Sequence, residues 1–184
     1  MRTSILLVFG AATFGAGCDD GFGPQLWDDT PVDAVIFSAA RPDLIGLPSA
    51  YDVVLLRSIR IEEPGATTNW DFALGELDGQ MVFLPAGLFP GISSRAGIAP
   101  LPDADFEDLE EAPRDTAAFT ARPVEVVEGR VYAVRSRRAQ CPSFAVGVMY
   151  AKILVREIDV ERGQVDLSVV RNPFCDLRTL VPPD

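Results

Sequence analysis

Residues 124–170 read VEVVEGRVYAVRSRRAQCPSFAVGVMYAKILVREIDVERGQVDLSVV, and this stretch decides the fold of the chain. We expect three successive strands. Side chains in 124–135 alternate as they do on a strand. Residues 144–155 are almost continuously apolar, which indicates a central strand buried on both faces. Apolar and polar residues alternate again over 165–169, so the third strand has one face toward solvent, and 161–163 form the turn before it.

The composition restricts the class of protein. A chain of 184 residues is long enough for one domain with its own core. The net charge is −11, from 27 acidic and 16 basic residues, which argues against a nucleic-acid partner. The chain has no histidine, so triads and histidine-based zinc sites are excluded, and Lys152 is the only lysine. An enzyme is therefore the least favoured class.

Further strands are expected before this stretch. Residues 32–39 and 51–61 are strand-like, and a hairpin is expected for 70–77 and 81–84 around the turn pair Asp78 and Gly79. The side chains expected in the core of the second region are Val53, Leu55 and Ile59.

Residues 103–111 carry six carboxylates, and apolar residues spaced three apart predict a short acidic helix. A calcium loop is the alternative, but Arg114 and Asp108 stand where an EF-hand needs an acid and a glycine. The predicted fold class is therefore all-β. We expect a single antiparallel domain over 32–184, sandwich-like or a partly open barrel, with one short acidic helix and long loops.

The N-terminus has the plan of a bacterial lipoprotein signal. An apolar run at 5–14 and small residues at 15–17 precede Cys18. We predict a signal peptide at 1–17, a lipidated Cys18 that attaches the protein to a membrane, and a flexible tether at 18–31 rich in Gly, Pro and Asp. The location is then the bacterial cell envelope, facing the periplasm or the exterior. A plain secretory signal that leaves Cys18 as a thiol is the alternative.

Cys141 and Cys175 remain once Cys18 is assigned to lipid. In an exported protein an even pair is most simply a disulfide. A reactive thiol pair is the competing interpretation, but the spacing is not CxxC.

Residues 85–102 mix Gly and Pro with five large apolar side chains. Such a loop either packs flat on the sheet as core cover or forms the lip of a binding site. On the second interpretation Met81 and Phe83 lie beneath the loop, and Arg95 supplies a contact to an anionic group. The apolar residues concerned are Leu88, Phe89, Ile92, Ile98 and Leu101.

Four short motifs occur in order along the chain: NWDFAL at 69–74, EEAP at 110–113, GRVYAVR at 129–135 and YAK at 150–152. Together they resemble the HmuY-type haem-binding lipoproteins over 67–170. The resemblance implies an all-β, lipid-anchored, non-enzymatic protein, and a haem held between two axial side chains. Members of the family are known for histidine ligands, and this chain has none.

Without histidine, only a thioether or a phenolate could replace the axial ligands. Met81 and Met149 are the methionines outside the predicted signal segment. Each also suits a β core, because methionine fills gaps between strands. With Arg95 and Phe89 they form the predicted binding residues, and haem is the cofactor that the resemblance implies.

Two functions follow from these patterns. The first is a lipid-anchored binding protein for haem or another apolar ligand that bears acid groups, which requires a concave site. The alternative is an interaction lipoprotein that docks on an envelope protein assembly through a flat apolar patch. No metal site is predicted.

Overall fold

The computed structural model describes residues 27–61, 66–141 and 145–182. Cys18, the predicted signal segment and residues 18–26 of the predicted tether lie outside these ranges. Within them, the strands pair antiparallel and the helical pieces are short 3-10 turns, which confirms the all-β prediction. No helix in the described ranges is long and apolar enough to cross a membrane. The 3-10 turns are η1 (Pro42–Leu44), η2 (Ala66–Thr68), η3 (Ala86–Leu88) and η4 (Thr116–Ala118).

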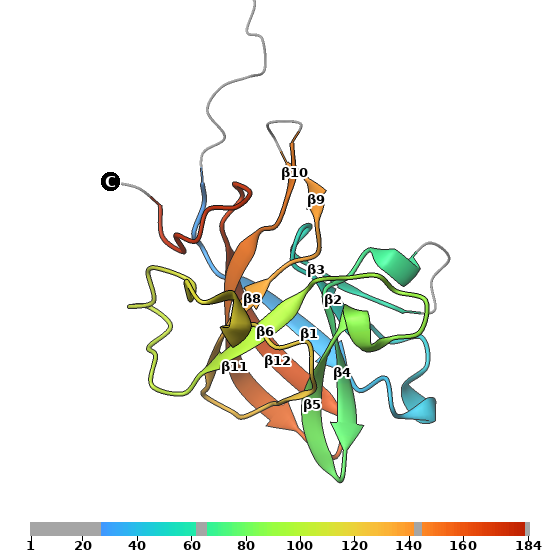
Figure 1. Ribbon diagram of the computed structural model, residues 1–184. Helices are drawn as coiled ribbons and strands as arrows, with labels where there is room; N and C mark the ends of the chain where they lie inside the picture. Colours follow the sequence, from blue (N-terminus) through green and yellow to red (C-terminus); the bar gives the residue numbers. More distant parts are fainter. Residues whose placement is uncertain (1–26, 62–65, 142–144, 183–184) are drawn as a thin grey trace, which may run out of the picture.

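The first five-stranded sheet contains the predicted central strand (Figure 1). Its order is β1-β12-β11-β8-β6, so β11 pairs on both sides, as its apolar sequence predicts. The predicted strand at 144–155 is nevertheless divided, because Val146 and Gly147 pair with a different strand. The members are β1 (Val32–Phe37), β6 (Gly97–Leu101), β8 (Val131–Arg135), β11 (Tyr150–Asp159) and β12 (Gln164–Arg171).

The second five-stranded sheet has the order β3-β2-β4-β5-β7. Its hairpin between β4 and β5 is the predicted one. Asp78 and Gly79 have φ angles of 52° and 79°, and a two-residue turn with positive φ at both positions matches the twist of the strands. The members are β2 (Ala50–Asp52), β3 (Arg57–Ile59), β4 (Phe72–Leu77), β5 (Gln80–Pro85) and β7 (Val124–Glu125).

The two sheets face one another across a single apolar core, and neither closes into a barrel. Aromatic rings join them: Phe83 lies edge-on to Phe72 at 5.1 Å and to Tyr132 of the opposite sheet at 5.3 Å. The inner face of β12 contributes Val165, Leu167 and Val169, all fully buried as predicted. The architecture is therefore the sandwich-like form of the predicted fold.

The region 51–61 corrects one prediction. It forms two short strands rather than one, joined by a turn in which Leu56 has a positive φ of 51°. The carboxylate of Asp52 accepts hydrogen bonds from the amides of Val54 and Leu55 at 2.9 and 3.1 Å, which closes this turn. Leu55 is consequently 58% exposed, and its predicted place in the core is wrong. Val53 and Ile59 are buried as expected.

The predicted acidic helix at 103–111 is also wrong, because this segment forms turns. The buried ammonium group of Lys152, on the outer face of β11, donates to the carbonyl of Phe106 at 2.7 Å and to that of Leu109 at 3.3 Å. In a helix the Phe106 carbonyl would accept from the Glu110 amide. Lys152, together with a hydrogen bond from the Leu180 amide to the Glu110 carbonyl at 2.7 Å, instead holds the segment in an irregular form against the sheet.

The region 85–102 is more regular than its composition predicts, since β6 lies within it. The amide of Ile98 points away from β8 and donates to the carbonyl of Thr120 at 3.1 Å. The nitrogen of Pro100, two residues later, points to the same outer side, so its missing N–H breaks no bond with β8. Proline is tolerated here because β6 is an edge strand.

Candidate functional site

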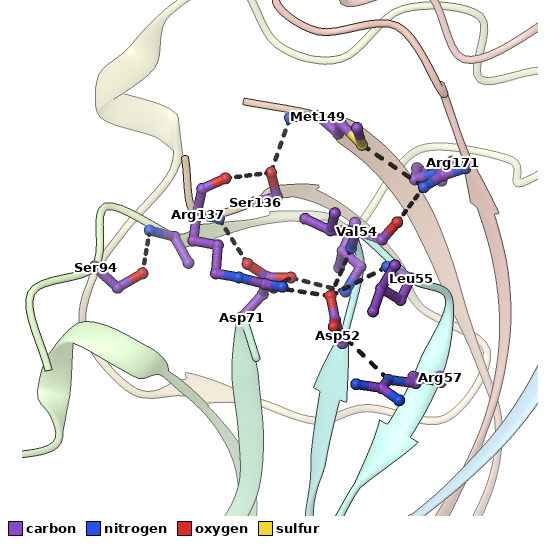
Figure 2. A network of polar contacts seen from close by, with 12 residues as sticks. Asp52, Val54, Leu55, Arg57, Asp71, Ser94, Ser136, Arg137, Met149 and Arg171 are labelled. Atoms are coloured by element: carbon purple, nitrogen blue, oxygen red, sulfur yellow. Dashed lines mark hydrogen bonds and ion pairs between the residues drawn. The ribbon is translucent and has the colours of Figure 1, made fainter. Parts of the chain in front are cut away.

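At the end of the sandwich where the chain leaves β8, the guanidinium of Arg137 binds the carboxylates of Asp52 and Asp71 (Figure 2). Nη1 of Arg137 lies 2.8 Å from Oδ1 of Asp52 and 3.0 Å from Oδ2 of Asp71. Both acids are buried, at 0% and 1% exposure. Asp52 ends β2, Asp71 immediately precedes β4, and Arg137 follows β8 of the other sheet. The ion pairs therefore fasten the two sheets together at this end.

Asp71 accepts two further hydrogen bonds, from backbone amides. They come from Arg137 at 2.6 Å and from Val53 at 2.7 Å. Burial nevertheless raises the pKa of Asp71 to about 6, because Arg137 and the two amides only partly offset the loss of water, and nearby Asp52 adds repulsion. Burial also acts against the charge of Arg137, but its hydrogen bond to Asp52 and the attraction of both carboxylates keep its pKa above the ordinary value.

The network holds the chain after β8 in place beside a cavity of about 630 Å³. Arg95, Arg137 and Arg138 line it, with Ile92, Ser94 and Gln140 among the other wall residues. A neighbouring cavity of about 310 Å³ is lined by Arg95, Arg135 and Arg138, and also by Tyr150 and Asp176.

The two cavities adjoin, because Arg95 and Arg138 line both. We call them the arginine groove, defined by its four arginines, Arg95, Arg135, Arg137 and Arg138.

Of the four groove arginines, only Arg137 forms an ion pair with a carboxylate among the described residues. Arg135 donates through Nε and Nη2 to the backbone carbonyl of Arg95, at 3.2 and 2.9 Å, and lies over the ring of Phe119. Arg138 donates to the carbonyl of Val146 at 3.1 Å. Asp176 is the one acidic residue of the described wall, and its Oδ1 accepts from the Val148 amide. The groove is therefore positive on a chain of net charge −11.

A disulfide-bound arm closes the far side of the groove. The strands β9 (Ala139–Gln140) and β10 (Val146–Gly147) stand above the sheets in Figure 1. Cys141 and Cys175 are bonded, with Cα atoms 5.9 Å apart, which confirms the predicted disulfide. A Cβ at Gly147 would lie 2.8 Å from Cβ of Cys175, so glycine is needed where the arm meets the C-terminal segment.

The predicted binding residues lie in different surroundings. Arg95 is exposed and lines the groove. Met81 is buried in the core between the sheets, and Met149 is buried beside Arg171, whose Nη1 donates to its sulfur at 3.7 Å. Phe89 packs edge-on against Trp70 at 4.9 Å, on the outer face of the second sheet. Neither methionine nor Phe89 lines the cavities described above.

Asp52, Asp71 and Arg137 are site residues that the sequence reasoning missed. A signal was available, because each acid interrupts a run of apolar residues, and buried acids are rare unless paired.

In the described ranges no group of three or more cysteine or acidic side chains is placed to hold a metal ion. Comparisons with family models, curated proteins and solved structures found no match for this chain.

Proposed function

We propose that this chain is an exported, lipid-anchored binding protein that captures an anionic ligand in the arginine groove. The observation that carries the proposal is the presence of three arginines, Arg95, Arg135 and Arg138, that line the groove without an ion pair to any described carboxylate. Guanidinium groups present several donors to carboxylate, sulfate or phosphate oxygens. These arginines form a local positive site on an acidic protein, and such a site attracts an anion.

The disulfide supports export, because such bonds persist in oxidising compartments. Lipid attachment at Cys18 remains a prediction from the signal-like N-terminus. The ligand that suits the groove has at least one acid group and some apolar surface, since Ile92, Val148 and Tyr150 belong to the walls. Neither methionine lines the groove, so haem coordination is not part of the proposal.

The test uses 1-anilinonaphthalene-8-sulfonate, an apolar probe with one acid group whose fluorescence rises on binding. We expect saturable binding to the wild type. The double variant Arg95→Gln/Arg138→Gln should bind the probe at least ten-fold more weakly, since the loss of a single charge-assisted hydrogen bond costs about 1.5 to 3 kcal/mol. Protoporphyrin IX, which has two propionates, provides a second acidic probe in the same titration.

The matched control is Arg122→Gln/Arg162→Gln, which makes the same change in net charge at exposed sites outside the groove. This control should bind like the wild type. Equal losses in the two double variants would show that net charge alone attracts the probe, and the groove would then have to be abandoned as the site. Thermal unfolding of each variant confirms that the fold is intact.

A further inference from the structure

A third cavity, with a different cation, lies at the start of the described chain, away from the arginine groove. Its volume is about 200 Å³. It lies between the first residue of β1, the end of β12 and the turn before β3. Most of the wall is apolar, and one arginine is part of it. The wall residues used below are Trp27, Val32, Leu56, Val169 and Arg171.

The charge of Arg171 has no partner of opposite sign among the described residues. Its Nη1 donates to the carbonyl of Val54 and to the sulfur of Met149, both of which are neutral acceptors. Its Nε is buried and has no hydrogen-bond partner. A guanidinium withdrawn from water without an ionic partner is destabilising, and such cations normally pair with a carboxylate or phosphate.

Asp52, the carboxylate that attracts the charge of Arg171, is already engaged. Its Oδ1 lies 2.8 Å from Nη1 of Arg137, and its Oδ2 lies 3.9 Å from Nε of Arg57. It influences Arg171 only by electrostatic attraction and forms no ion pair with it. Burial is the largest influence on Arg171 and lowers its pKa, while Asp52 and Tyr51 raise it by less. Two other polar atoms in this region, the hydroxyl of Tyr51 and Nε1 of Trp27, are also buried without partners.

One residue in the wall of this cavity has a strained backbone conformation, which supports its assignment as a ligand site. Leu56 has a φ of 51°, the left-handed region that non-glycine residues rarely adopt. The same turn presents the Val54 carbonyl to Arg171. Strained residues of this kind persist where the surroundings over-determine them, and they gather at ligand sites.

We propose that the cavity at Arg171 is a binding site for the carboxylate of a small apolar acid. The carboxylate supplies the missing negative charge, and the apolar chain lies against Val32, Leu56 and Val169. Each water-sized group occupies about 30 Å³, so the cavity holds a ligand of roughly six non-hydrogen atoms. Asp28 also lines the cavity, but its carboxylate is exposed, so solvent screens its repulsion. This inference does not rest on the proposed function.

The probe for the test is butyrate, with butyramide as its uncharged isostere. We expect butyrate to raise the melting temperature of the full-length protein and to shift the NMR signal of the Arg171 Nε–H. Butyramide should bind roughly ten-fold more weakly, because it cannot neutralise the guanidinium. Equal binding of the two probes would overturn the proposal, as would an Arg171 signal that butyrate leaves unmoved.

Because Arg171→Gln could unfold the protein by releasing the Val54 carbonyl, the deciding variant is Val32→Phe. Val32 is 36% exposed, so the larger ring can fill the cavity without entering the core. Val160→Phe, at an exposed turn, is the matched control. The shift of the Arg171 Nε–H signal on addition of butyrate should be lost in the first and kept in the second. A shift that survives in Val32→Phe would refute the site. The groove variant Arg95→Gln/Arg138→Gln should show the same shift as the wild type.

Discussion

The buried acid Asp71 should make the stability of this protein fall as the pH rises from about 4 to about 6. Its pKa is raised from 3.8 to about 6 in the folded state, mainly by burial. The folded protein therefore binds more protons than the unfolded chain in this window. Stability is greatest below the unfolded pKa and is lost as the pH passes through the folded pKa. At 1.36 kcal/mol per unit, the contribution of Asp71 is about 3 kcal/mol.

The substitution Asp71→Asn removes this titration and keeps the shape of the side chain. It also weakens the bonds to Arg137 and to the Val53 amide, so the variant should be less stable at every pH. Its deficit, however, should be about 2 kcal/mol larger at pH 4 than at pH 7, because the full contribution of Asp71 is reached only below the unfolded pKa. Urea unfolding at pH 4, 5, 6 and 7 measures this difference, because urea does not screen charges.

Asp43→Asn provides the control, since Asp43 is exposed and the hydrogen bond from Arg41 lowers its pKa. Because this variant keeps Asp71, its stability should fall from pH 4 to pH 6 as that of the wild type does, and its deficit should be no larger at pH 4 than at pH 7. Carbon NMR of the Asp71 carboxyl group should give a midpoint near 6. Parallel pH profiles for the wild type and Asp71→Asn, or a midpoint near 4, would refute the reasoning from burial.

Three further predictions concern covalent and long-range contacts. Replacing Cys141 and Cys175 with serine should lower the free energy of unfolding by roughly 4 kcal/mol, for a bond that spans 34 residues, as urea titration can measure. Lys152→Met should destabilise the protein by roughly 2 kcal/mol and expose 103–111 to proteases, because buried loop carbonyls lose their donor. An N-terminal peptide carrying acyl chains on Cys18 is expected by mass spectrometry; an unmodified cysteine would contradict the lipid anchor.

Several elements follow from local chemistry alone. The alternation in 165–169 sets which side chains face inward, because successive residues of a strand point to opposite faces. Asp78 and Gly79 suit a tight hairpin, since both positions need positive φ. The even number of cysteines after Cys18 predicted the disulfide. Each of these inferences depends on residues close together in the chain or on a count.

The predictions that proved wrong concern segments held by contacts that their local pattern does not reveal. Nothing within 103–111 shows that Lys152 will bind its carbonyls, so a helical pattern gave the wrong answer. Leu55 is apolar and stands in a strand-like run, yet the carboxylate of Asp52 turns the chain and exposes it.

The binding surfaces depend on the same kind of distant contact. Asp52 and Asp71 meet Arg137 across separations of 85 and 66 residues. Composition reveals a run of arginines at 135–138, but it cannot show which of them is neutralised. The packing of the two sheets settles that, because it brings two acids to Arg137 and none to Arg171 among the described residues. The periodicity of the chain thus sets which faces are buried, and the pairing of distant strands sets where unbalanced charge remains.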